Sequence, residues 1–119
     1  MRTTKITLLG KEYTLCLSTR VMMALEDRSG TFGDFMSSLT RIDNKMFLLE
    51  QLLRAGYVAD RLEGLDPPEP PDPDALMDGT DLDDYEAINE AITKCLQLGT
   101  DRKVEARAKK KAGDETLAG

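Results

Sequence analysis

The prolines of this chain are confined to one short stretch, which limits where helices and strands can lie. All five fall between Pro67 and Pro73, within the acidic sequence Asp-Pro-Pro-Glu-Pro-Pro-Asp-Pro-Asp at positions 66–74. Proline fixes φ and lacks a backbone N–H, so this stretch cannot continue a helix or a central strand. We therefore predict an exposed, acidic, partly polyproline-like loop over residues 63–79, with regular structure on either side.

Two short segments near the N-terminus alternate between apolar and polar residues with a period of two. Residues 6–8 and 13–17 show this pattern, and Gly10-Lys11 suits a two-residue turn with glycine at its first central position. The pattern predicts a β-hairpin in which Leu9 pairs with Glu12. In this register the larger apolar groups except Leu9 share one face, with Leu8 opposite Tyr13, Ile6 opposite Leu15 and Thr4 opposite Leu17.

Helical periodicity follows the hairpin in three segments. Ser18 or Thr19 suits the N-cap of a helix over residues 19–29, for which Gly30 is the expected stop. A short helical turn is expected after the break at 31–33. Asp43 suits the N-cap of a longer helix that reaches Ala55, where Gly56 ends it or a kinked continuation follows. The apolar residues of the three segments are Val21, Met22 and Leu25, then Phe35, Met36 and Leu39, then Met46, Phe47, Leu49, Leu52 and Leu53, with Val58 and Leu62 in the continuation.

A last helix is predicted after the proline-rich loop. Thr80-Asp81-Leu82-Asp83 matches a capping box, and Gly99 is expected to end the helix. Its apolar stripe is the longest in the chain and consists of Leu82, Tyr85, Ile88, Ile92, Cys95 and Leu96. Residues 100–119 are basic and poor in large apolar side chains, so we expect a flexible tail there.

These segments together predict the fold class. A chain of 119 residues has the length of one domain. We predict a single α+β domain over residues 1–99, in which an N-terminal two-stranded β-hairpin packs on three to four α-helices. The acidic proline-rich loop and the flexible basic C-terminal tail complete this description.

Composition narrows the classes of function. The chain lacks histidine, the commonest general base and metal ligand, so we expect no enzyme activity, no metal site and no cofactor. A net charge of −6 disfavours nucleic-acid binding. We expect no membrane contact either, because no apolar run approaches the roughly 20 residues needed to cross a bilayer. Cys16 and Cys95, in a chain without a recognisable leader, indicate free thiols in a reducing cytoplasm.

Charge is segregated along the second half of the chain. Residues 60–90 contain twelve acids and one base, whereas residues 94–111 contain seven bases and two acids. One interpretation is a solvated loop beside a solvated tail. The other is a polar docking surface, within the molecule or between molecules, that meets the opposite charge.

Several methionine and leucine side chains are candidates for partner binding. Methionine fills gaps in cores, but an exposed methionine adapts to many partners. We predict that the partner-binding residues lie on the helices of the first half, at Met22, Met23, Met46, Leu49 and Leu53.

The order of these motifs resembles a known family. The hairpin with Gly10-Lys11-Glu12-Tyr13, the helix ending in Leu25-Glu26-Asp27-Arg28-Ser29-Gly30 and the later Leu52-Leu53-Arg54-Ala55-Gly56 are similar to the small tail assembly chaperones of long-tailed bacteriophages and prophages. The similarity covers about residues 1–57 well and 80–98 loosely. The proline-rich loop and Tyr57, where a small aliphatic residue is more familiar, depart from the family pattern.

The resemblance implies a non-catalytic role in virion morphogenesis. Members of that family bind the long, helical tape measure protein in the host bacterial cytoplasm, keep it soluble and help to recruit tail tube subunits. It also implies self-association along that partner, and absence from the mature virion. An alternative from another class is an acidic inhibitor or adaptor, antitoxin-like or anti-defence, that uses residues 60–90 to occupy a basic site.

Overall fold

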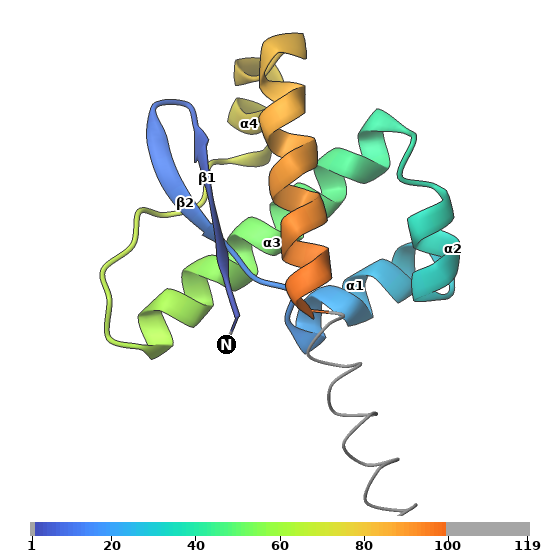
Figure 1. The fold of residues 1–119 in the computed structure, drawn as a ribbon, viewed down its shortest axis with the longest axis horizontal. Coiled ribbons are helices and arrows are strands. Elements are labelled where there is room, and N and C mark those ends of the chain that lie inside the picture. The colour runs from blue at the N-terminus through green and yellow to red at the C-terminus, as the bar shows by residue number, and fades with distance from the viewer. Residues whose placement is uncertain (1, 100–119) are drawn as a thin grey trace, which may run out of the picture.

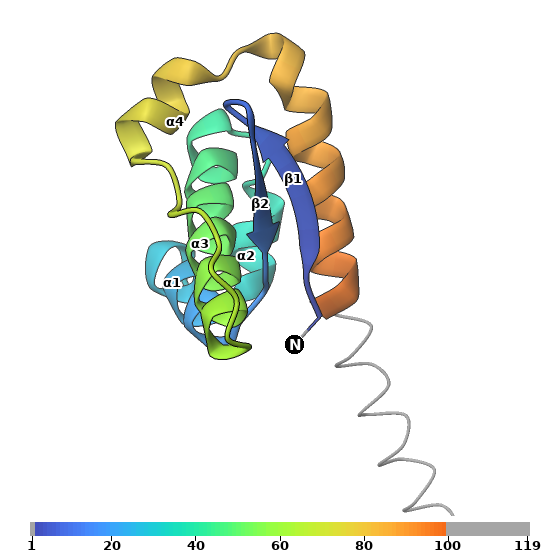
Figure 2. The ribbon, with the colours of Figure 1, turned by 90° about the vertical axis from the view of Figure 1, so that its left-hand side faces the viewer.

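The hairpin occupies the centre of the fold, with helices on both sides. The computed structural model describes residues 2–99, and Figures 1 and 2 show the hairpin between α3 on one side and the helical segment 82–99 on the other. The architecture is α+β, and apolar residues from the hairpin and the helices share one core. In chain order the elements are β1 (Thr4–Leu8), β2 (Lys11–Leu15), α1 (Thr19–Ser29), α2 (Phe32–Ser37), α3 (Ile42–Leu62), α4 (Pro73–Gly79) and the segment 82–99.

The predicted hairpin is present, but its register differs from the predicted one by two residues. The turn is formed by Leu9 and Gly10, whose φ angles of 51° and 77° define a type I′ turn instead of a turn at Gly10-Lys11. Leu8 therefore lies opposite Lys11, Ile6 opposite Tyr13 and Thr4 opposite Leu15, and Leu17 lies beyond the strand. Because a shift of two residues preserves the alternation of faces, the apolar residues still share the predicted face.

The predicted helix over residues 19–29 is confirmed as α1. The Ser18 side chain accepts a hydrogen bond from the Val21 N–H, and Gly30 ends the helix with a φ of 97°. The next helix, α2, begins earlier than predicted because Thr31 and Asp34 form a reciprocal capping box around its first turn. The predicted break at residues 31–33 is therefore the start of a helix.

Helix α3 extends through Gly56 to Leu62, so it does not end at Ala55. Its N-cap is Arg41, and Asp43 lies in the first turn instead of capping the helix as predicted. A Cβ atom built on Gly56 would overlap with the backbone carbonyl of Thr14 on β2. The glycine therefore lets a helix and a strand approach backbone to backbone, and the Cys16 N–H donates a hydrogen bond of 3.2 Å to the Leu52 carbonyl of α3.

A buried polar network also joins the hairpin to α3. The Thr14 hydroxyl donates to the Asp60 carboxylate at 2.6 Å and accepts a hydrogen bond from the Lys5 ammonium group, also at 2.6 Å. The Lys5 nitrogen lies 3.9 Å from the Asp60 carboxylate. Since Asp60 is buried, these two partners compensate for much of the cost of placing its carboxylate there.

Removing the hydroxyl should therefore weaken the fold. Thr14→Val is expected to lower the free energy of unfolding by about 1–3 kcal/mol, because Asp60 loses a hydrogen-bond donor in a buried position. Thr7→Val is the matched control, since Thr7 is an exposed threonine on β1. Urea unfolding of both variants measures the difference, and equal stability of the two would contradict a structural role for the network.

The segment after α3 is only partly the loop that was predicted. Residues 65–72 have no regular structure, but residues 73–79 form α4, with Pro73 in its first turn. Proline is tolerated there because the N–H groups of a first helical turn have no partner within the helix. Leu76 is fully buried and attaches α4 to the core, which explains why the loop ends before residue 79.

The helical segment 82–99 begins one residue later than the predicted capping box implies. Asp81 and Asp84 cap it: the Asp81 N–H donates to the Asp84 carboxylate, and the Asp83 N–H donates to the Asp81 carboxylate. Its buried stripe starts at Ile88, while Leu82 is 81% exposed. Gly99, the predicted end, is itself helical, and the predicted tail at 100–119 lies outside the described residues.

Candidate functional site

Three of the five predicted partner-binding residues are part of the core. Met46, Leu49 and Leu53 are buried on the inner face of α3, so a partner cannot reach them in this fold. Met22 is half-buried, and Met23 is 66% exposed on α1. The strongest apolar stripe of α3 thus identifies the surface that packs inside the protein, and the candidate site lies elsewhere on the same helix.

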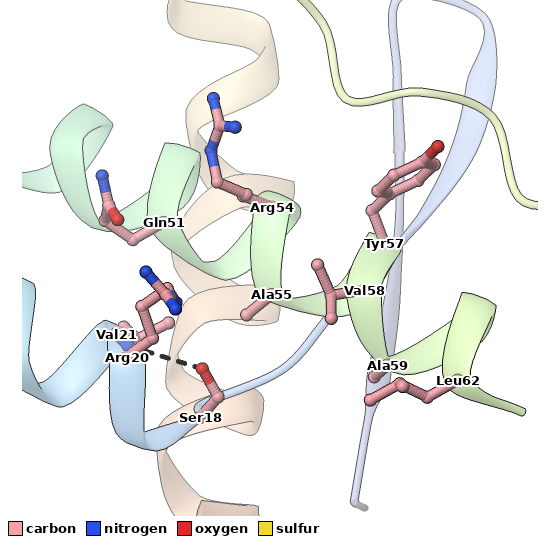
Figure 3. Close-up of a pocket in the computed structure, with 10 residues that line it drawn as sticks. All are labelled: Ser18, Arg20, Val21, Gln51, Arg54, Ala55, Tyr57, Val58, Ala59 and Leu62. Carbon is pink, nitrogen blue, oxygen red and sulfur yellow. Dashed lines mark hydrogen bonds between the residues drawn. The ribbon is translucent and has the colours of Figure 1, made fainter.

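A groove lies between the start of α1 and the C-terminal half of α3. Its volume is about 450 Å³, and Figure 3 shows the residues that line it, which come from both helices. Its lining combines apolar side chains with two arginines, and consists of Ser18, Arg20, Val21, Gln51, Arg54, Ala55, Tyr57, Val58, Ala59 and Leu62. This groove, called the α1–α3 groove from here on, is the candidate site.

A second stripe of α3 forms one wall of the α1–α3 groove. Gln51, Ala55, Val58 and Leu62 are separated by four, three and four residues, a spacing that places them on one face of a helix. Val58 is 49% exposed and Leu62 is 79% exposed, so the larger apolar groups of this stripe lack cover from the described residues. The same spacing forms the contact seam between paired helices, which makes this face suited to an additional helix.

The groove carries positive charge on a protein of negative net charge. Arg20 on α1 and Arg54 on α3 contribute to its lining, no acidic residue does, and the whole chain has a net charge of −6. Neither arginine forms a salt bridge with another residue in the range 2–99. Glu50 precedes Arg54 by one turn, and its partial burial raises the pKa of its carboxyl despite the opposing influence of Arg54.

Tyr57 is held in place at the edge of the groove by Arg61. The Arg61 guanidinium donates a hydrogen bond of 2.8 Å to the Tyr57 hydroxyl, and its central carbon lies 5.6 Å from the ring centroid. This hydrogen bond also raises the pKa of Arg61 above its ordinary value. A tyrosine that is fixed in this way offers a rigid aromatic surface at low entropic cost to a binding partner.

The reactive groups of the protein do not lie in the groove. Cys16 and Cys95 are buried and free, and desolvation raises the pKa of the Cys95 thiol to about 12. This thiol is therefore protonated at neutral pH and is a poor nucleophile. Within residues 2–99, no three histidine, cysteine, aspartate or glutamate side chains gather as a metal site would require. The groove can supply apolar contact and positive charge, which are properties of a binding surface.

Comparisons with known proteins leave the family open. No protein-family model, curated protein or solved structure matches this chain. In the described part of the chain, none of the helices has both the length and the apolarity of a membrane span. Function is therefore proposed from the groove and from the sequence resemblance.

The sequence contains a pattern that indicates one wall of the groove, but the residues of this pattern are not among the predicted binding residues. By their spacing along the chain, Val58 and Leu62 predict only a continuation of the helix. Together with Gln51 and Ala55 they form a second stripe beside the core stripe, and a helix with two apolar stripes packs on one and exposes the other when no neighbour covers it. Arg20 has no comparable signal, because its place in the groove depends on how α1 packs on α3.

Proposed function

We propose that this protein is a non-enzymatic tail assembly chaperone that binds a helical segment of a tape measure protein in the α1–α3 groove. The observation that carries the proposal is the exposed Val58 and Leu62 stripe on the wall of an open groove. Apolar faces of a long helical partner would aggregate in water, and covering them removes apolar surface from solvent. The order of motifs in residues 1–57 supports the phage context.

The proposal includes the other partners that the resemblance implies. The chaperone would act in the host bacterial cytoplasm, associate with itself along the tape measure protein and help to recruit tail tube subunits. The exposed stripe lies on α3, and α3 is held in place because its other face packs against the hairpin. The stripe is therefore already ordered before a partner binds. A preorganised surface lowers the entropic cost of each binding event.

Co-expression tests this function. The tape measure protein that this proposal assigns as partner should be largely insoluble alone and should become soluble, and co-purify, when this protein is produced with it. Its fraction in the supernatant after centrifugation is the measurement. If the fraction is the same with and without this protein, the chaperone function is ruled out.

A second candidate function is favoured by the acidic surface. Ten of the twelve acidic residues between positions 60 and 90 are exposed. Such a surface fits an inhibitor or adaptor that occupies a basic site on its target. Binding through ten exposed acidic groups should weaken steeply with ionic strength. Binding through the α1–α3 groove should weaken less, because it combines an apolar stripe with only two arginines, so salt titration of the complex distinguishes the two functions.

A further inference from the structure

We infer that the α1–α3 groove selects an amphipathic helix that carries acidic residues beside its apolar stripe. This inference rests on the proposed function only in assuming that the bound partner is helical. It adds a charge requirement that the partner must meet. Three features support this requirement: the positive charge in the groove lining, the helical spacing of the exposed stripe, and the distribution of charge over the rest of the protein.

The two arginines flank the apolar stripe from different helices. Arg54 precedes Val58 by one turn of α3 and lies beside the stripe, while Arg20 comes from α1 on the opposite wall. In the view of Figure 3, Arg54 extends from α3 away from α1, and Arg20 lies beside Val21 on α1. A helix lying against the Val58 and Leu62 stripe would therefore have an arginine near each flank. In paired helices, the positions that flank the apolar seam determine which partner is accepted.

The charged side chains that line the α1–α3 groove are all positive. Arg20 and Arg54 are both exposed, and the lining contains no acidic residue to neutralise them. Acidic residues dominate the surface over positions 60–90. A partner with acidic flanks is thus attracted by the groove and repelled by that acidic surface, which favours binding in the groove over binding at residues 60–90.

A helix with basic flanks does not fit the same arrangement. Each of its lysines would lie close to an arginine in partly desolvated surroundings, where repulsion between like charges is strong. The chain's own basic stretch, residues 103–111, therefore has the wrong sign for this groove. The acidic helix is the one occupant that satisfies both the apolar stripe and the charges.

Two designed peptides test the inference. Each has about 20 residues, long enough to form a helix, with leucine at the a and d positions of a heptad. One carries glutamate at the flanking e and g positions and the other carries lysine, and both are used below the concentration at which they self-associate. Binding to the full-length protein is measured by fluorescence anisotropy. The acidic peptide should bind at least about tenfold more tightly than the basic one at low salt.

Charge reversal shows whether the preference comes from the groove. The variant Arg20→Glu/Arg54→Glu should prefer the basic peptide, and circular dichroism should show that it remains folded because both side chains are exposed. The variant Lys11→Glu/Lys94→Glu changes the net charge by the same amount at exposed sites outside the groove, and it should keep the original preference.

Three results would overturn the inference. These are equal or undetectable binding of the two peptides, an unchanged preference in the arginine variant, or a reversed preference in the lysine variant. The co-expression experiment has its own readout, the solubility of the tape measure protein. A soluble complex together with equal peptide binding would therefore reject the charge requirement and leave the proposed function standing.

Discussion

Gly56→Ala is expected to destabilise the protein by about 3 kcal/mol or more. The added Cβ would occupy the position of the Thr14 carbonyl, so α3 and β2 would have to separate. Alanine is the better helix former by about 1 kcal/mol, which offsets only a small part of this loss. The free energy of unfolding in urea measures the result.

Gly33→Ala is the matched control for this experiment. Gly33 is an exposed residue of α2, and the nearest atom to a Cβ there is the Thr31 hydroxyl oxygen at 3.8 Å, an ordinary contact. This variant should change the free energy of unfolding by less than about 1 kcal/mol. Equal stability of the two glycine variants would show that α3 and β2 do not approach as closely as the structure places them.

Gly56 also illustrates which features the sequence could not predict. A glycine within a helical pattern suggests a helix end or a kink, and the residues around Gly56 are consistent with both. Its role depends on a strand more than 40 residues earlier in the chain, and local patterns contain no information about that contact. Of the two alternatives, the helix continues through Gly56 to Leu62, and this continuation forms part of the candidate site.

Local features were predicted well where a short-range interaction decides them. The caps of α1 and the shared apolar face of the hairpin follow from neighbouring residues, and both are present. The exact hairpin register was wrong because Leu9 adopts a positive φ, which is uncommon for a leucine. Helix α4 was missed because burial of Leu76 stabilises it, and seven residues with a proline at the start carry no strong helical pattern.

Three of the five predicted binding residues lie in the core for a related physical reason. A strong apolar stripe identifies the face that a helix buries, so Met46, Leu49 and Leu53 belong to the core. A binding face must remain exposed, and its apolar residues are fewer. Recognising Val58 and Leu62 as that face requires knowing what covers the rest of α3.

The second large effect is expected at Leu62. Leu62→Asp should weaken binding of the tape measure protein at least about tenfold, because the variant places a charge on the apolar stripe where the partner helix would pack. Since Leu62 is 79% exposed, the fold should not change, and circular dichroism checks this. Leu82→Asp is a closely matched control: Leu82 is also a helical leucine, is 81% exposed and does not line the groove.

The most direct test of groove binding is co-expression of the tape measure protein with these two variants. The fraction of tape measure protein that remains soluble and co-purifies is measured for the wild type, Leu62→Asp and Leu82→Asp. If the partner binds in the α1–α3 groove, the wild type and Leu82→Asp should give a soluble complex, and the partner should remain insoluble with Leu62→Asp. Equal solubilisation by the wild type and a folded Leu62→Asp variant would contradict binding in the groove.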